Sequence, residues 1–259
     1  MGDPAADDTG QEVSIPSIVT RVVSLVPSLT EAIATTAPGL LVGATDWCSH
    51  PADLDVTRVR GTKNPRIDQI VTLAPDLVVG NEEENRPGDL AALRAAGLAV
   101  WTTAPHTVDQ ALQSLDRLLR VACRLPRPDW LDRAEQAWAT LALPSETVRV
   151  LVPIWRRPWM ALGRDTFAGD VLHRLGHVNV LAGSPDRYPR IEPDVAAGVD
   201  LVVLPDEPYR FTADDGPEAF ADIPAALVSG RHLTWYGPSL AEAPARLAAE
   251  LAARIPAGG

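Results

Sequence analysis

The chain has 259 residues, long enough for two lobes of about 100–150 residues each or for one large domain. Its 34 acidic residues outnumber its 23 basic residues and give a formal net charge of −11. That balance, with no basic block to neutralise phosphates, excludes a general nucleic-acid partner. No run approaches the roughly 20 apolar residues that span a bilayer, so we expect no membrane insertion.

The N-terminal segment, residues 1–17, is acidic and polar and predicts a disordered tail. It lacks the basic start and the apolar stretch of about 7–15 residues that a secretory signal peptide needs. As given, the sequence predicts a cytoplasmic protein; the alternative is an extracytoplasmic protein whose leader is missing from this sequence. The two cysteines, Cys48 and Cys123, make no disulfide framework and no Cys-x-x-Cys pair.

Residues 18–106 predict an N-terminal α/β lobe. A β-branched run at 22–26 predicts a strand, and the stretch Ser28–Glu31 fits a capping box that starts a helix. Asn64, which precedes a proline, predicts the start of a second helix. The segment APDLVV then predicts a helix stop followed by a buried strand.

Residues 107–146 predict two amphipathic connecting helices. Apolar residues recur at helical spacing from Val108 to Ala122, and a second series begins at Leu131 after two prolines. A helical connection of this length predicts a rigid strut, whereas a Gly/Ser linker would let two lobes flap.

The third part, residues 147–259, repeats the first as a C-terminal α/β lobe. RVVSLVPS (21–28) is similar to VRVLVPIW (148–155), and RIDQIVTLAPDLVVG (66–80) matches RIEPDVAAGVDLVVLP (190–205). Strands that alternate with helical stretches predict parallel βαβ units. We therefore predict an α/β fold of two similar lobes, each with a central, mostly parallel sheet flanked by helices. A long backbone helix joins the lobes, and the ligand cleft lies between them.

Most of the aromatic residues follow predicted strands. Open parallel sheets bind ligands beyond the carboxyl ends of their strands, so aromatic side chains there predict a flat, apolar-faced ligand. Arg156 or Arg157 would hold a phosphate, amide or carboxylate of that ligand. Alternatively, Trp159 and Met160 are hydrophobic packing beneath the surface. The predicted ligand-binding residues are Ser28, Trp47, Lys63, Asn64, Glu82, Trp155, Arg156, Trp159, Glu207, Tyr209, Phe211, Trp235 and Tyr236.

The segment DWCSHP raises the possibility of a metal site. Asp46, Cys48 and His50 stand at alternate positions, so an extended segment would show all three on one side. These side chains could ligate Zn²⁺ or another transition metal; the alternative is a strand end with a buried cysteine and a turn histidine. The acidic run 82–84 is either a cation or amide binder or a solvated loop. Glu207, between two prolines that fix its backbone, is the stronger candidate.

The sequence shows none of the common catalytic or nucleotide-binding motifs. There is no Gly-x-Gly-x-x-Gly after a strand, no Walker loop and no Gly-x-Ser-x-Gly elbow. We expect a non-catalytic binding protein without an intrinsic cofactor. The alternatives are a cytoplasmic metal-binding protein or enzyme on the same two-lobed fold, and a protein-interaction module.

Several segments together resemble the helical-backbone metal-receptor superfamily, from about residue 20 to residue 254: RVVSLVPSLTE, NPRIDQIVTLAPDLVVG, IWRRPWMALGRDTFAGDVLHRLG and WYGP. These are the type III substrate-binding proteins of ABC importers, and the likeness is closest to the cobalamin-binding branch. The resemblance implies two α/β lobes joined by one rigid backbone helix. It also implies a metal-bearing ligand, with cobalamin or another corrinoid first and a ferric siderophore or haem second.

The resemblance further implies roles for single residues. Trp47 aligns with an aromatic residue that packs on the corrin, and TWYGP aligns with a second such stretch. Lys63 stands where the cobalamin binder of the family has a tryptophan. Asp68 falls where an acidic residue docks on the membrane permease, and Glu192 is its partner in the repeat. We expect a monomer that binds a small metal complex and an ABC importer permease.

Overall fold

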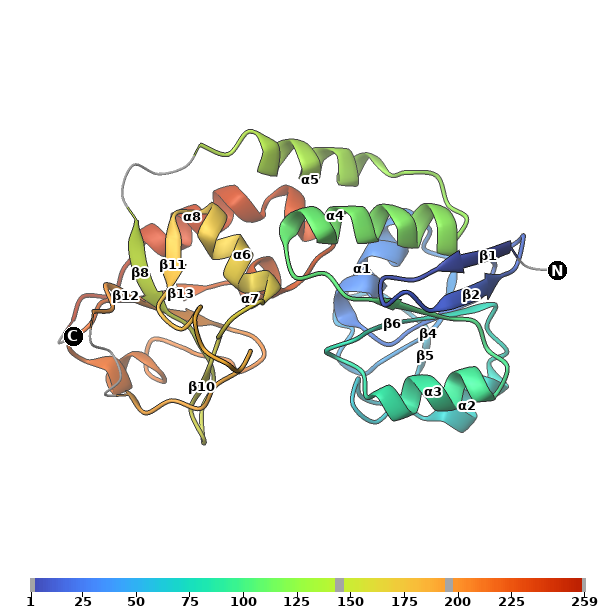
Figure 1. Ribbon diagram of the computed structural model, residues 1–259, viewed down its shortest axis with the longest axis horizontal. Helices are drawn as coiled ribbons and strands as arrows, with labels where there is room; N and C mark the ends of the chain where they lie inside the picture. The colour runs from blue at the N-terminus through green and yellow to red at the C-terminus, as the bar shows by residue number, and fades with distance from the viewer. Residues whose placement is uncertain (1–2, 143–146, 194–197, 258–259) are drawn as a thin grey trace. The chain divides into compact units, whose positions relative to one another are not determined.

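The computed structural model describes residues 3–142, 147–193 and 198–257 (Figure 1). Its contacts divide the chain into two compact units. Unit 1 comprises Met1–Pro105, Asp109–Asp132 and Tyr236–Pro238, and unit 2 comprises His106–Val108, Arg133–Trp235 and Ser239–Gly259. No helix among the described residues is long and apolar enough to cross a membrane.

Unit 1 is built on a parallel five-stranded sheet with the order β5-β4-β3-β6-β7. Its strands are β3 (Val22–Ser24), β4 (Leu41–Ala44), β5 (Thr57–Arg58), β6 (Leu77–Asn81) and β7 (Val100–Thr103). Helices α1 (Pro27–Thr36) and α4 (Val108–Arg117) lie on one side of the sheet, and α2 (Ile67–Thr72) and α3 (Pro87–Ala95) on the other (Figure 1). Buried aliphatic side chains between the sheet and the second helix pair form the core, among them Val78, Leu93 and Val100.

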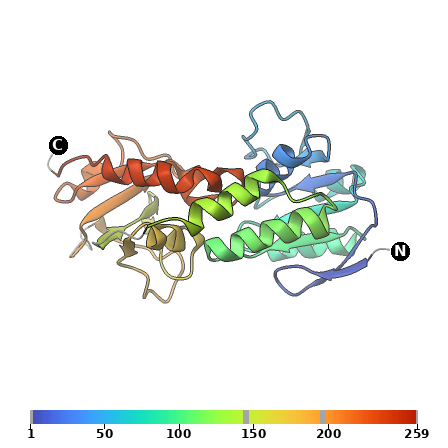
Figure 2. The same ribbon diagram turned by 90° about the horizontal axis from the view of Figure 1, so that it is seen from above.

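Unit 2 is built on a parallel four-stranded sheet with the order β11-β8-β12-β13. Its strands are β8 (Val148–Leu151), β11 (His177–Asn179), β12 (Leu201–Pro205) and β13 (Ala225–Val228). Its helical segments are α6 (Phe167–Arg174), η3 (Pro217–Phe220), α7 (Gly230–Thr234), η4 (Pro238–Ala241) and α8 (Ala243–Ala252). Helix α8 runs beside β13 (Figure 2). A short antiparallel pair, β9 (Pro153–Trp155) and β10 (Met160–Ala161), follows β8.

The strand order confirms the internal repeat and the α/β class. Four neighbouring strands of unit 1, β4-β3-β6-β7, have the same order along the chain and in space as β11-β8-β12-β13 of unit 2. The matched segments APDLVV and GVDLVV become β6 and β12, an interior strand of each sheet. Every residue of both strands is buried, as continuous apolar runs in parallel sheets predict.

The connecting segment is helical but not one continuous helix. Helix α4 passes into a π-helical turn, η1 (Leu118–Ala122), and α5 starts at Asp129 and ends at Ala139. Between them Arg124 takes a positive φ of 57°, and two prolines without an N–H follow, so the helical hydrogen bonds cannot continue. The contacts also divide the segment: α4 and the start of α5 group with unit 1, and the rest of α5 with unit 2. The last part of the segment, 143–146, lies outside the described residues.

Residues 3–15 form an ordered hairpin, which corrects the prediction that residues 1–17 are a disordered tail. Strands β1 (Asp3–Ala6) and β2 (Glu12–Ile15) form an antiparallel hairpin. In β2 the side chains alternate between exposed and buried, with Val13 and Ile15 buried. This period-two pattern makes a half-buried strand, and the acidic composition of the segment concealed it.

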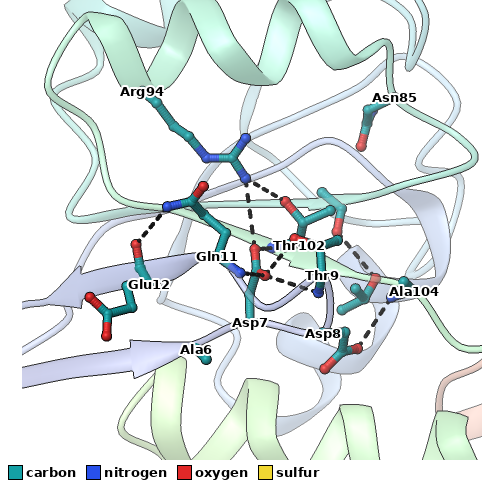
Figure 3. Close-up of polar contacts among 12 residues, drawn as sticks. Ala6, Asp7, Asp8, Thr9, Gln11, Glu12, Asn85, Arg94, Thr102 and Ala104 are labelled. Carbon is teal, nitrogen blue, oxygen red and sulfur yellow. Dashed lines mark hydrogen bonds and ion pairs between the residues drawn. The ribbon is translucent and has the colours of Figure 1, made fainter.

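The hairpin turn is fixed to unit 1 by two aspartates (Figure 3). The buried carboxylate of Asp7 accepts hydrogen bonds from the backbone N–H of Gln11 (3.0 Å) and of Thr102 (3.1 Å). Asp8 accepts from the N–H of Ala104 (3.2 Å) and pairs with Arg117 (2.6 Å). Two of the acidic residues that suggested disorder, Asp7 and Asp8, therefore form hydrogen bonds and an ion pair within the folded unit.

The two predicted helix starts are both displaced in the structure. Helix α1 begins with Pro27 at its first position and Val26 as N-cap, so Ser28 lies inside the first turn and caps nothing. Helix α2 begins after Arg66, not at Asn64. The hydroxyl of Thr166 accepts from the N–H of Gly169 (3.2 Å) and caps α6.

Candidate functional site

Trp47 is the exposed aromatic residue at the strand ends of unit 1. It lies in the turn after β4, and 69% of its surface is exposed. A Cβ placed on Gly61 would lie 3.1 Å from Trp47 Nε1 and 2.6 Å from Asn64 Oδ1. The edge of the indole and the amide of Asn64 therefore pack on the bare backbone of Gly61, which leaves the rest of the indole accessible. A side chain at Gly61 would displace one of them.

The acidic loop after β6 is held by its backbone. Asn81 Oδ1 accepts hydrogen bonds from the N–H groups of Glu83 (2.8 Å) and Glu84 (3.0 Å). Lys63 Nζ donates to the backbone carbonyl of Glu83. Glu82 is exposed, and its N–H donates to the carbonyl of Thr103 (3.0 Å). Lys63 and Glu82 thus lie in one ordered group of loops at the carboxyl ends of β6 and β7.

Tyr236 is buried in the same unit, although the sequence predicted it as a ligand contact. Its hydroxyl accepts from Asn81 Nδ2 (2.7 Å) and lies 2.9 Å from the hydroxyl of Thr103. Burial raises the pKa of the Tyr236 hydroxyl. Ser28, also predicted, is buried as well, and its Oγ has no hydrogen-bond partner among the described residues. Both side chains lie in the interior and are not exposed for a ligand.

The structure does not support a metal site at Asp46, Cys48 and His50. The segment is a turn, closed by the N–H of Cys48 on the carbonyl of Thr45 (3.2 Å), so alternate residues do not share a side. Cys48 is buried, with its sulfur 3.0 Å from the hydroxyl of Thr30, and burial raises the pKa of its thiol. Across the described residues, no group of three metal-ligating side chains comes together. The alternative, a buried cysteine at a strand end, matches this geometry.

In unit 2 the segment IWRRPWM forms the β9–β10 hairpin and separates its two tryptophans. Trp155 is 43% exposed and meets the ring of Tyr209 edge-on at 5.7 Å. Trp159 instead stacks on Phe211, with the ring centroids 5.9 Å apart and an interplanar angle of 3°, and meets Phe220 at 5.2 Å. Phe211 is buried in the core of the unit. Trp159 and Phe211 were predicted as ligand contacts, and the structure places them in hydrophobic packing instead.

Arg156 is already engaged by two carboxylates. Its Nη1 contacts Asp215, and its Nη2 lies 2.6 Å from Glu218 Oε1. Its guanidinium also lies over the ring of Trp159, 5.1 Å from the centroid. The hydrogen bond from Tyr209, together with Arg156, lowers the pKa of Asp215. The Arg156 guanidinium, which was predicted to hold a ligand group, is thus paired with acidic side chains of the same chain. Arg157, the other candidate, is exposed at the turn.

Glu207, just after β12, and Trp235, at the end of α7, form a pair that is mostly enclosed. Trp235 is 8% exposed, and its Nε1 donates to Glu207 Oε2 (2.8 Å). Burial raises the pKa of Glu207, and Asp206 adds to this, while the hydrogen bond from Trp235 opposes it. A Cβ on Gly230 would lie 2.6 Å from the backbone nitrogen of Glu207, so α7 can start this close to Glu207 only because residue 230 has no side chain. Trp235, also predicted as a ligand contact, is thus mostly enclosed.

The sequence missed the acidic partners of Arg156. Asp215 and Glu218 stand 59 and 62 positions after it, in a polar run that looks like an ordinary solvated loop, and no local pattern joins them to Arg156. Gly61, which supports Trp47, gave no signal either. The two proposed docking acids, Asp68 in the first turn of α2 and Glu192, are both exposed.

Comparisons with known proteins agree on the class. No family model matches the chain. A vitamin B12-binding protein of Vibrio cholerae serotype O1 is 25% identical over 201 residues, covering 75% of this chain and 70% of that protein. The crystal structure of the periplasmic vitamin B12-binding protein BtuF of Vibrio cholerae has a TM-score of 0.71 at 21% identity, covering 90% of this chain and 97% of that one. The periplasmic haem-binding protein RhuT from Roseiflexus sp. RS-1 has a TM-score of 0.74 at 22% identity, covering 90% of this chain and 98% of that one.

The fold, the repeat and these matches confirm the predicted resemblance to the type III substrate-binding proteins. The curated relatives are vitamin B12-binding proteins, and the structural neighbours are binding proteins as well. The relatives and neighbours named here are binding proteins, so the enzyme alternative is not favoured.

Proposed function

We propose that the chain binds a corrinoid, cobalamin first. Each unit offers one exposed tryptophan for this ligand, Trp47 in the segment after β4 and Trp155 in the segment after β8. The observation that carries this proposal is the exposure of Trp47 and Trp155. The chain has seven tryptophans, and the other five are buried or half-buried. Large apolar side chains left exposed at the ligand-binding edge of a sheet mark a binding surface, and relatives of this chain are named for binding vitamin B12.

The residues around these tryptophans suit a ligand with a flat face and a polar rim. An indole face covers the apolar face of a macrocycle and is worth about 0.5–1.5 kcal/mol beyond the area it buries. Asn64, Lys63 and Glu82 lie near Trp47 or in the adjoining loop and offer donors and acceptors for amide groups at the rim of a corrin. In unit 2, Tyr209 extends the aromatic surface of Trp155.

Haem and ferric siderophores are the second choice of ligand. They share the flat or metal-bearing character of a corrinoid, and a structural neighbour is named as a haem-binding protein. That likeness, at 22% identity, supports the fold alone, whereas the sequence relatives are named for vitamin B12. Cobalamin is therefore tested first.

The proposal includes transport. Structural neighbours are named as periplasmic proteins, which supports the extracytoplasmic alternative over a cytoplasmic location. We propose that the chain acts as a monomer that delivers its ligand to an ABC importer permease, with Asp68 and Glu192 as the docking acids. Charge reversal at both positions, in Asp68→Lys/Glu192→Lys, should abolish binding to the permease in detergent and leave ligand affinity unchanged.

The experiment is a titration of the purified protein with hydroxocobalamin, followed by tryptophan fluorescence and by calorimetry. We expect micromolar or tighter binding that weakens about tenfold or more, or ~1.4 kcal/mol, in Trp47→Ala and in Trp155→Ala. Trp138→Phe is the matched control, because that buried indole donates to the carbonyl of Leu240 (3.0 Å). Absence of binding in the wild type contradicts the cobalamin proposal and directs the same assay to haemin and ferric siderophores.

A further inference from the structure

We infer that Arg156 and Asp215 are positioning residues that fix Tyr209 and Trp155 as one rigid aromatic surface in unit 2. This inference rests on the proposed function, because it explains how one of the two exposed tryptophans is held ready for a ligand. It gives Arg156 a role other than the direct ligand contact that its sequence position suggested.

Arg156 is constrained on three sides. Its two terminal nitrogens are taken by Asp215 and by Glu218, the latter at 2.6 Å, and its planar face lies 5.1 Å from the centroid of Trp159. Only 18% of its side chain is exposed. A guanidinium that is paired with two acids and stacked on a ring is held in one orientation, so it is a strong anchor for the loop that carries the two acids.

Asp215 links the anchored Arg156 to Tyr209. One carboxylate oxygen contacts Arg156, and the other accepts a hydrogen bond from the Tyr209 hydroxyl at 2.7 Å. Reciprocal backbone hydrogen bonds between Thr212 and Asp215, at 3.0 and 3.3 Å, hold the acid in place. The Asp215 carboxylate therefore binds the fixed guanidinium of Arg156 with one oxygen and the hydroxyl of Tyr209 with the other.

Tyr209 in turn fixes Trp155. Its ring meets Trp155 at 5.7 Å with an interplanar angle of 78°, and meets the buried Phe211 at 4.7 Å. The backbone of Trp155 is paired with Met160 in the hairpin. With its hydroxyl held by Asp215, the Tyr209 ring is kept against the indole and restrains its rotation. An aromatic surface ordered in advance binds more tightly because less side-chain freedom is lost on binding.

Three variants test the link. Asp215→Ala breaks the connection between Arg156 and Tyr209 and leaves Arg156 paired with Glu218. Tyr209→Phe keeps the ring and removes only the hydroxyl. Arg156→Gln removes the anchor. Arg246→Gln is the matched control, since it breaks another arginine–glutamate pair of the same unit, within helix α8 (2.9 Å to Glu250).

Two readouts are needed for each variant. The first is affinity for hydroxocobalamin by calorimetry, with haemin as the second probe. The second is the indole N–H signal of Trp155 in a ¹⁵N–¹H NMR spectrum of the ligand-free protein, assigned with Trp155→Phe. We expect all three test variants to weaken binding by roughly five- to tenfold and to shift or broaden the Trp155 signal, and Arg246→Gln to do neither.

The outcomes separate this inference from the proposed function. If the wild type binds neither probe, the proposed function fails, and the NMR readout alone decides whether Asp215 and Tyr209 position Trp155. A Trp155 signal unmoved by Asp215→Ala and Tyr209→Phe overturns the inference. It is equally overturned if the signal moves and affinity stays at the wild-type value, or if Arg156→Gln alone loses affinity, which would make Arg156 a direct contact.

Discussion

The hydroxyl of Tyr236 is a buried polar group that meets the Asn81 amide and the Thr103 hydroxyl in unit 1. Asn81 also holds the acidic loop through the N–H groups of Glu83 and Glu84. A single buried hydroxyl therefore supports the residue that shapes the loop. Buried polar groups that lose a partner are costly because water cannot replace it.

Removing this hydroxyl should cost stability. We expect Tyr236→Phe to lower the free energy of unfolding by about 1–3 kcal/mol, because it leaves the amide of Asn81 short of an acceptor inside the unit. Urea unfolding followed by circular dichroism measures the change. A variant as stable as the wild type would show that the hydroxyl is not a structural group.

Glu207 should make stability depend on pH in the opposite sense to most carboxylates. Its pKa is raised in the folded chain by burial, so the folded state holds this proton more tightly than the unfolded state does. Stability from this group is then present below the ordinary glutamate pKa of about 4.3 and falls as pH rises from there through the raised value.

Glu207→Gln should remove that dependence. Glutamine can still accept the hydrogen bond of the Trp235 indole, and it carries no charge to bury. Across pH 4 to 8, we expect the melting temperature of the variant, relative to that of the wild type, to rise with pH until Glu207 is fully ionised. A difference that shrinks as pH rises would mean that ionised Glu207 stabilises the fold.

Among the elements, the N-terminal hairpin protects an edge of the sheet in unit 1. Strand β7 is the last strand in the described order, and an edge strand offers unpaired backbone groups to other chains. The hairpin turn occupies them: Asp8 N–H donates to the carbonyl of Thr102 (3.1 Å), and the carboxylates of Asp7 and Asp8 accept from Thr102 and Ala104. Figure 3 shows this cluster, with Arg94 reaching toward Asp7 and Thr102.

Asp7→Ala should therefore destabilise unit 1. We expect a loss of about 1.5–3 kcal/mol, typical of hydrogen bonds to a buried charged group, since the N–H of Thr102 loses its acceptor. The matched control is Glu12→Ala, an exposed acid of the same hairpin, for which we expect less than about 0.5 kcal/mol. Equal effects in both variants would show that the turn is not the anchor.

The elements that the sequence could predict are those with a regular pattern. The repeat of APDLVV and GVDLVV identified two interior strands because parallel strands buried on both faces are continuous apolar runs. The β1–β2 hairpin was missed, since only Val13 and Ile15 carry its pattern within an acidic segment. Two alternating apolar residues do not predict a strand within an acidic segment unless the surface that buries them is known.

The candidate site was harder to predict, because exposure depends on contacts between distant segments. Trp155 and Trp159 stand four positions apart with similar neighbours, yet one is 43% exposed and the other stacks on Phe211. The hairpin between them sends their side chains to different surroundings. Likewise, the partners of Arg156 come from a loop whose acids have no local signature.

At the scale of the whole molecule, the net charge of −11 bears on which ligand is taken. The summed field of an acidic protein repels anions as they approach, and salt screens it, with a Debye length of about 30 Å at 0.01 M and about 10 Å at 0.1 M. Haem carries two carboxylates and a net negative charge, whereas cyanocobalamin has no net charge. The protein's own charge thus favours the corrinoid during encounter.

Stopped-flow measurement of association at increasing salt tests this preference. For cyanocobalamin we expect a rate constant that changes by less than about twofold between roughly 10 and 300 mM salt, because a neutral ligand feels no net attraction or repulsion. For haem, if it binds, we expect a rate constant that rises about threefold or more as the repulsion is screened. A haem rate that falls with salt would mean that a local positive surface outweighs the net charge, and the order of the two ligands would then reverse.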